Sequence, residues 1–252
     1  KFSISLLPPN ESGSKMIGGG LALDDSGNLY VTTSFGEVVS LSSESGEIFW
    51  RYKFNSPYLS APTVINSQLF VIDASGISRS FSLEGDQNWI QEGLGSENIR
   101  YGSVQAKIVD NILLLPTSAG TLDAVDPKTG IKLWDFHFNS QRKGYAGSAL
   151  GDFGGNPVVS DNHIFYGSSN GQFVSLNLDG RKKWQVPVGV QGSPVAIGNS
   201  LFFISDLSEL TRITKADGSL VWTNPISMLT EKNHYFEPLL AGSRLWITGS
   251  HK

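Results

Sequence analysis

The sequence predicts an all-β fold assembled from repeated four-stranded antiparallel units, and three observations predict it. Apolar residues alternate in short runs such as Val38–Leu41 and Phe173–Leu176, which is typical of strands. Glycine accounts for 28 of 252 residues and occurs in most of the turns between these runs, where a positive φ costs it little. Five tryptophans close successive segments of similar pattern: Trp50, Trp89, Trp134, Trp184 and Trp222.

The repeats occupy approximately residues 18–54, 60–92, 102–138, 155–188 and 192–225. Each begins with a short strand A, followed by an apolar strand B, a tight turn, an alternating strand C, a turn with glycine, and a strand D that carries the closing Trp. The predicted A strands are Leu21–Leu23, Thr63–Ile65, Gln105–Val109, Pro157–Ser160 and Pro194–Ile197. Four strands in about 40 residues, repeated along the chain, are typical of a β-propeller blade.

We therefore expect a single β-propeller domain over residues 1–252. One blade cannot bury both of its faces alone, so the five closing Trp side chains are predicted to pack between neighbouring blades. The alternative for one of them is stacking on a carbohydrate or a quinone. Two repeats depart from the pattern. Pro116 lies within the third strand B, which predicts a bulge or an early strand end, and Asp206–Glu209 replaces the glycine turn of the fifth repeat.

The third repeat carries a family resemblance most clearly. Its segment Gly120–Trp134, GTLDAVDPKTGIKLW, resembles the PQQ-type (quinoprotein-like) propeller repeat, and the resemblance covers nearly the whole chain. Among non-enzymatic members, the chain is most similar to the BamB family, lipoproteins of the outer-membrane β-barrel assembly machinery. This resemblance implies a periplasmic scaffold attached to the inner leaflet of the outer membrane, with a lipid anchor outside this sequence. It implies as partner a protein of the assembly machinery, unfolded barrel proteins, or both.

The resemblance also implies eight blades, which need about 336 residues at about 42 residues each. A partial sixth repeat occupies residues 237–252, with Trp246 inside its apolar run. We therefore expect about five complete blades and a partial one, from a fragment of an eight-bladed ring. The alternative is a complete six-bladed ring in which Lys1–Leu7 adds a closing strand.

Composition and motifs argue against several function classes. A net charge of -4 with 17% charged residues does not favour nucleic-acid binding, and no apolar run is long enough to span a membrane. The chain has no Cys, and its four His form no compact ligand pair, so no metal site is expected. Asp24–Asn28 is interpreted as a hairpin turn, because Phe35 stands where a calcium loop needs its Glu. No catalytic or cofactor-binding residues are predicted; the alternative is a degenerate quinoprotein propeller that binds PQQ or another small ligand with calcium.

Loops on a rigid scaffold are the predicted binding elements. In an up-and-down blade the D–A and B–C connections lie at one end, and the D–A loops are the long ones. The third combines aromatic and cationic side chains suited to a protein interface, and the acidic fifth B–C turn is a second candidate. The alternatives are a solvated connection and simple repeat drift. The partner-binding candidates are Phe138, Arg142, Lys143, Tyr145, Asp206, Leu207 and Glu209.

Overall fold

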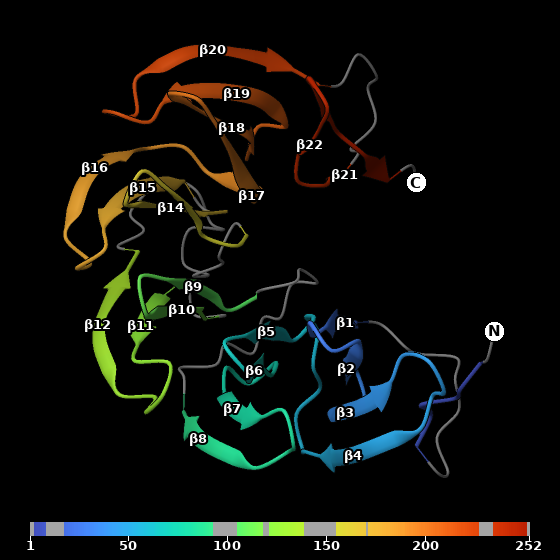
Figure 1. Ribbon diagram of the computed structural model, residues 1–252. Coiled ribbons are helices and arrows are strands. Elements are labelled where there is room, and N and C mark those ends of the chain that lie inside the picture. Colours follow the sequence, from blue (N-terminus) through green and yellow to red (C-terminus); the bar gives the residue numbers. More distant parts are fainter. Residues whose placement is uncertain are drawn as a thin grey trace. The chain divides into compact units, whose positions relative to one another are not determined.

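Each of the five sequence repeats forms one four-stranded antiparallel sheet in the computed structural model (Figure 1). The structure describes residues 3–8, 18–92, 105–117, 121–138, 155–169, 171–226 and 234–250, and within these ranges there are strands and turns but no helix. The all-β class and the four-stranded repeating unit predicted from the sequence are therefore confirmed.

The strands pair in chain order within every four-stranded sheet. The first sheet contains β1 (Gly19–Leu23), β2 (Asn28–Thr33), β3 (Glu37–Ser42) and β4 (Ile48–Lys53), and the second contains β5 (Thr63–Ile65), β6 (Gln68–Ile72), β7 (Ser78–Ser82) and β8 (Gln87–Gln91). The third contains β9 (Lys107–Val109), β10 (Ile112–Pro116), β11 (Thr121–Val125) and β12 (Lys132–His137). The fourth contains β13 (Val158–Ser160), β14 (His163–Ser168), β15 (Gln172–Asn177) and β16 (Lys182–Val186). The fifth contains β17 (Val190–Ile197), β18 (Ser200–Ser205), β19 (Glu209–Thr214) and β20 (Leu220–Pro225).

The partial sixth repeat forms two short strand pairs. Strand β22 (Leu239–Ala241) pairs with β23 (Arg244–Trp246), and β21 (His234–Tyr235) pairs with β24 (Gly249–Ser250). The chain as a whole divides into two compact units, Lys1–Ser118 with Asp123–Leu133, and Ala119–Leu122 with Trp134–Lys252.

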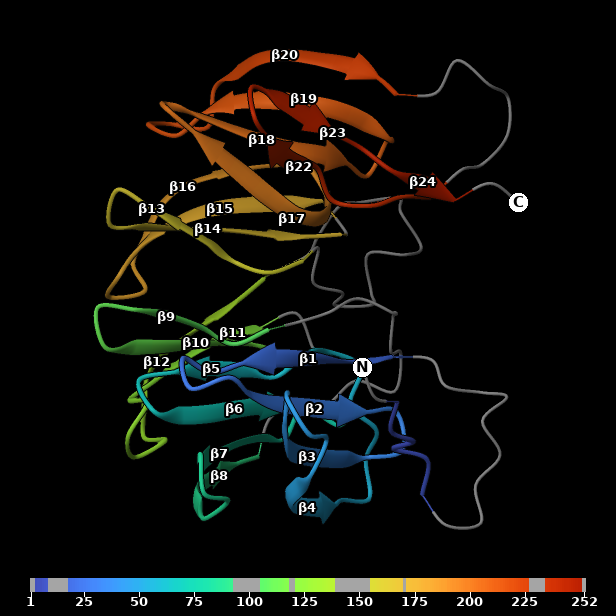
Figure 2. The same cartoon turned by 45° about the vertical axis from the view of Figure 1, so that its right-hand side comes forward.

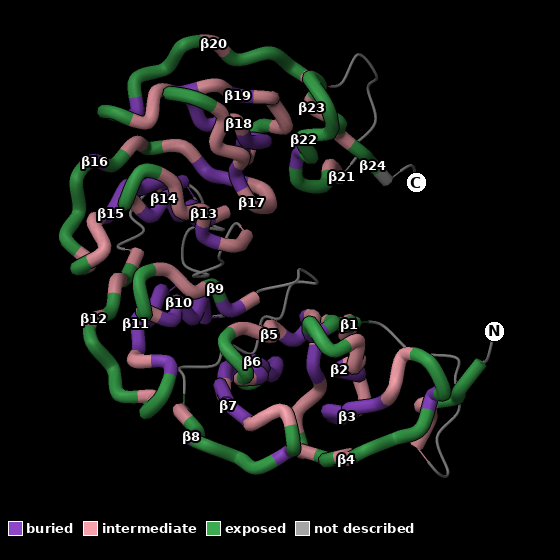
Figure 3. Tube along the Cα trace, in the orientation of Figure 1, coloured by how far each residue is buried: buried purple, intermediate pink, exposed green. Residues whose placement is uncertain are grey.

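The core lies between consecutive sheets within each unit. Strands β1 to β4 follow one another across the first sheet (Figure 2). The middle strands are largely buried, as in β7 and β15, whereas the fourth strands β4, β8, β16 and β20 are mostly exposed (Figure 3). Alternate side chains of one strand face opposite neighbours. Thus Leu69 and Phe81 pack with Val38 of the first sheet, while Phe70 packs with Leu113 of the third. This two-sided burial is what the period-two pattern predicts for stacked sheets.

The closing Trp side chains follow one rule from sheet to sheet. Each of the first four donates its indole N–H over 2.9 Å to a carbonyl in the C–D turn of the next repeat: Trp50 to Leu83, Trp89 to Pro127, Trp134 to Leu178 and Trp184 to Lys215. A half-buried Trp222 packs beside Phe202 of its own sheet, with ring centroids 5.9 Å apart. Within the described residues its indole N–H has no acceptor.

The glycine of each receiving turn explains why the turn can approach so closely. A Cβ on Gly130 would lie 2.7 Å from Cδ2 of Trp89, and one on Gly180 would lie 2.7 Å from Cδ2 of Trp134. Both glycines also have a positive φ, which a side chain would strain. The second glycine of the sequence repeat therefore serves the turn and the neighbouring Trp together.

Strands C and D are irregular at a repeated position. The register shifts next to the residue paired with the closing Trp, between Ser40 and Leu41 in the first sheet and between Ser175 and Leu176 in the fourth. Equivalent shifts occur in the second and fifth sheets. Such bulges increase the local twist of a strand pair and bend the outer strand.

The departures noted in the sequence have structural counterparts. Strand β10 ends at Pro116, as expected, because proline has no N–H for the ladder. Ser208 adopts a φ of 60° where the other turns use glycine. Asp24 accepts hydrogen bonds from the N–H groups of Ser26 and Asn28, which closes the β1–β2 hairpin turn expected there.

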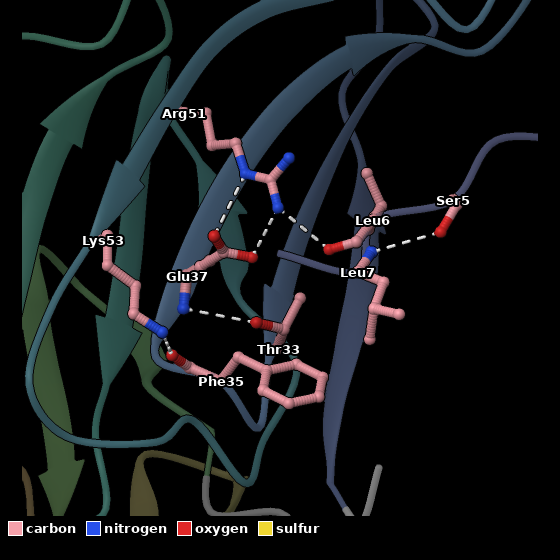
Figure 4. A network of polar contacts seen from close by, with 8 residues as sticks. All are labelled: Ser5, Leu6, Leu7, Thr33, Phe35, Glu37, Arg51 and Lys53. Atoms are coloured by element: carbon pink, nitrogen blue, oxygen red, sulfur yellow. Dashed lines mark hydrogen bonds and ion pairs between the residues drawn. The ribbon is translucent and has the colours of Figure 1, made fainter. Parts of the chain in front are cut away.

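The described N-terminal residues 3–8 are not part of a sheet. They lie against the first sheet, where Arg51 donates from Nη2 to the carbonyl of Leu6 over 2.9 Å (Figure 4). The same guanidinium holds Glu37 through two hydrogen bonds of 3.1 and 2.7 Å. The alternating pattern of Lys1–Leu7 therefore does not produce a strand over residues 3–7.

Candidate functional site

Backbone hydrogen bonds join the loop and the turns at one end of the first and second sheets. The D–A loop Phe54–Pro62 is tied to the first B–C turn, because Phe54 N–H donates to the carbonyl of Gly36 over 2.7 Å and Tyr58 N–H donates to that of Thr33 over 3.1 Å. The second B–C turn is tied to the same loop, since Ala74 N–H donates to the carbonyl of Pro57 over 2.8 Å. Loop and turns thus form one hydrogen-bonded platform.

A cleft of about 260 Å³ opens on this platform. Its polar and charged lining comes from both repeats, and two apolar side chains complete it. The lining residues are Lys53, Phe54, Asn55, Ser56, Asp73, Ser75, Ile77 and Arg79. Lys53, which lines the cleft, donates from Nζ to the carbonyl of Phe35 (Figure 4).

A buried ion pair forms part of the cleft wall. Arg79 donates from Nη1 to Asp73 Oδ2 over 2.7 Å, and the two side chains are only 8% and 0% exposed. The guanidinium carbon lies 4.3 Å from the ring centroid of Phe54, within cation–π range. The Tyr58 hydroxyl is 3.4 Å from the same Nη1, and burial raises its pKa while the nearby Arg79 opposes that shift.

Two residues of this cleft depart from the repeat, and the sequence reasoning missed them. At the position of Asp73, the other repeats carry a hydroxyl residue: Thr33, Thr117, Ser168 or Ser205. At the position of Arg79 they carry Val39, Asp123, Val174 or Thr211. The signal was present in the aligned repeats, since a charged residue at a position that is apolar in two repeats marks a site that packing alone does not explain.

Of the four described partner-binding candidates, three make contacts within the chain and one is exposed to solvent. Phe138 packs on Tyr166, with centroids 5.1 Å apart, rather than standing free. Asp206 Oδ1 accepts from Gly189 N–H over 3.2 Å, and Glu209 Oε2 accepts from Thr223 over 3.1 Å. Leu207 is 67% exposed at the tip of the same turn. The candidates Arg142, Lys143 and Tyr145 lie outside the described residues.

Neither a metal centre nor a spanning helix emerges from the described part of the chain. No group of three His, Cys, Asp or Glu side chains converges there. No helix in those ranges is long and apolar enough to cross a membrane.

A family model described as outer membrane protein assembly factor BamB matches residues 7–224. The BamB protein of Shewanella oneidensis is 23% identical over 198 residues, which cover 78% of this chain and 50% of that protein. The BamB protein of Legionella pneumophila is 26% identical over 116 residues, which cover 46% of this chain and 30% of that protein. The chain thus spans about half or less of the length of these curated relatives.

Solved structures show the same fold. The crystal structure of BamB from Moraxella catarrhalis aligns with a TM-score of 0.82 at 19% identity, over 92% of this chain and 70% of that one. A europium-containing methanol dehydrogenase aligns with a TM-score of 0.68 at 14% identity, over 86% of this chain and 52% of that one. Because an assembly factor and an enzyme both share the fold, the fold alone does not decide between binding and catalysis.

Proposed function

The chain belongs to the family of outer membrane protein assembly factor BamB, and from that premise we propose that it is a non-enzymatic periplasmic scaffold. In this proposal it is attached to the inner leaflet of the outer membrane and assists the assembly and insertion of β-barrel proteins. Its partner is a protein of the barrel-assembly machinery, an unfolded barrel protein, or both. The family match over residues 7–224 carries the proposal.

Two surfaces suit such a partner. The first is the loop end of the sheets, where Leu207 offers an exposed apolar side chain on a turn fixed by hydrogen bonds. The second is the outer edge of the fourth strands, which stand last in their sheets and where an extended polypeptide could add as a further strand. Apolar side chains are exposed on these strands, including Phe49, Ile90, Leu133 and Leu220.

A pull-down from detergent-solubilised envelope, read by mass spectrometry, tests the proposal and separates the two surfaces. Leu207→Asp and Leu220→Asp form a matched pair, because the two leucines are 67% and 64% exposed on the turn and on β20 respectively. Loss of barrel-assembly proteins with Leu207→Asp alone supports the loop end, and loss with Leu220→Asp alone supports the strand edge. The reversal Arg142→Glu with Lys143→Glu tests the third D–A loop in the same assay.

Enrichment of no barrel-assembly protein by the wild-type chain would contradict the proposed function. Unchanged capture by the doubly reversed loop variant would remove the third D–A loop from the interface. Each variant is compared with wild type by thermal unfolding, so that lost capture is not confused with lost structure.

The second candidate is a degenerate quinoprotein propeller that binds PQQ or another small ligand with calcium. The specific observation in its favour is the fold similarity to the methanol dehydrogenase. The described residues fit it poorly, since no three potential metal ligands converge among them. Titration with PQQ and calcium, followed by quinone absorbance, tests it: saturable calcium-dependent binding would favour this candidate over the scaffold.

A further inference from the structure

The second B–C turn contains a charged residue, Asp73, at the position where the other four repeats have Thr or Ser. Thr33, Ser168 and Ser205 each accept a backbone N–H of their own turn through a hydroxyl oxygen. Asp73 does the same work with Oδ1, which accepts from the N–H groups of Ser75 and Ile77. Its second oxygen is not needed for the turn and instead holds Arg79.

The guanidinium of Arg79 is only partly satisfied. Its hydrogen bonds to described residues all leave from Nη1, and its buried Nε has no partner among them. The residue as a whole is 6% exposed. A buried donor without an acceptor is unfavourable, and each such group in a native structure needs an explanation. Nη2 also makes no hydrogen bond to a described residue and is not among the fully buried unpartnered atoms, so it is the nitrogen left for an acceptor in the cleft.

The cleft fits a small anion with an apolar neighbour. Lys53 and Arg79 contribute two positive charges against one negative charge from Asp73, a net charge of +1. Phe54 and Ile77 supply apolar surface beside them. The volume of about 260 Å³ is smaller than most pockets for cofactors or drug-sized ligands, so it suits one or two amino-acid residues.

We propose that this cleft binds a carboxylate group of a polypeptide, held by Nη2 of Arg79 and by Nζ of Lys53. A carboxylate has two oxygens, and each can accept a charge-assisted hydrogen bond from one of these two cations. The group comes either from the C-terminus of an extended chain or from an Asp or Glu side chain. The inference rests on the proposed function, because a scaffold for proteins presents polypeptide to this surface.

Four short peptides test the inference on the wild-type chain, with binding followed by NMR titration into the millimolar range. N-acetyl-glycyl-phenylalanine is compared with its C-terminal amide, and N-acetyl-glycyl-aspartyl-glycinamide with its asparagine counterpart. We expect at least one carboxylate peptide to bind about tenfold or more tightly than its uncharged counterpart. A difference of this size in Kd corresponds to the loss of one charge-assisted hydrogen bond. The first comparison reports a C-terminal carboxylate, and the second reports an acidic side chain.

The repeats themselves supply the variant. Asp73→Thr with Arg79→Val installs the residues that the first repeat carries at Thr33 and Val39, so it removes the buried pair without leaving one charge alone. We expect it to fold and to bind the carboxylate peptides at least about tenfold more weakly. Arg79→Lys keeps the charge beside Asp73 but has one nitrogen in place of Nη1 and Nη2, so it should weaken binding in the same direction. Lys128→Met, at an exposed C–D turn position, is the control for an ordinary loss of charge.

Three results would overturn the carboxylate site: no peptide binding to wild type, equal binding of acid and amide, or undiminished binding by the folded Arg79 variants. If any of these occurs while the wild-type chain still captures barrel-assembly proteins from the envelope, the site is wrong and the proposed function stands. If capture fails and the carboxylate peptides still bind, the site stands without the partner class proposed for it.

Discussion

Removal of one closing Trp measures how much the contact between sheets stabilises the protein. Trp89 is 8% exposed and donates to the carbonyl of Pro127 over 2.9 Å. Trp89→Ala removes the ring, leaves a cavity and orphans the carbonyl, so we expect a loss of about 4 kcal/mol in the free energy of unfolding. For a chain of this size each kcal/mol shifts the Tm by roughly 2–4 °C, which predicts a fall of roughly 8–16 °C.

The chain contains its own control. Trp222 occupies the same repeat position but is half-buried, and its indole N–H has no acceptor among the described residues. Trp222→Ala should therefore cost about 1–2 kcal/mol. Trp89→Phe keeps most of the apolar ring and removes the N–H, and it should also cost about 1–2 kcal/mol. Thermal unfolding followed by circular dichroism compares the three variants. Equal losses of unfolding free energy for Trp89→Ala and Trp222→Ala would refute the idea that contact between the indole and the turn of the next repeat stabilises the protein.

Three further predictions concern stability. Gly130→Ala should cost about 2–3 kcal/mol in urea unfolding, because the new Cβ meets the Trp89 ring in addition to the strain of a positive φ. Gly242→Ala, which also has a positive φ but nothing within 4 Å, should cost only about 1 kcal/mol, and equal costs would contradict the ring contact. Ser208→Gly should raise the Tm, because glycine adopts the φ of 60° at lower cost; a lowered Tm would show that the serine side chain matters. The hydrogen bond and charge of Lys215 hold the pKa of Asp161 below its usual value. The pair therefore stabilises the folded protein at any pH above the usual pKa of an unfolded Asp. This stabilisation disappears as the pH falls through the lowered pKa of the folded state. The stability difference between wild type and Lys215→Met should therefore shrink below about pH 4, and a pH-independent difference would argue against the pair.

Most of the fold could be predicted because its determinants are local and repeated. Alternating runs and turn glycines specify each sheet, and five repetitions average out single departures such as Pro116 and Ser208. The limits of the pattern appear at the chain's edges. The alternation in Lys1–Leu7 resembles a strand, but a strand also needs a partner edge, and Leu6 instead accepts a hydrogen bond from Arg51.

The site was less predictable because it depends on contacts between repeats. Sequence reasoning selected the third D–A loop and the fifth B–C turn, yet Asp206 and Glu209 of that turn are occupied by local hydrogen bonds. The cleft instead depends on Asp73 and Arg79, six residues apart on a turn and a strand, and on a loop from the preceding repeat. Only a comparison of repeat against repeat, position by position, reveals that this pair is unusual. Composition and motif spacing average such a difference away.

The hydrogen bonds of the closing Trp residues give the stack of repeats a polarity. In each of these four contacts the indole belongs to one repeat and the accepting carbonyl to the C–D turn of the next, so these repeats associate head to tail. Each repeat contains both a closing tryptophan and a glycine in its C–D turn. A duplicated or transplanted repeat would therefore meet a complementary contact on either side. Gene duplication can therefore lengthen or shorten such a chain without inventing a new interface, provided that the tryptophan and the glycine travel together.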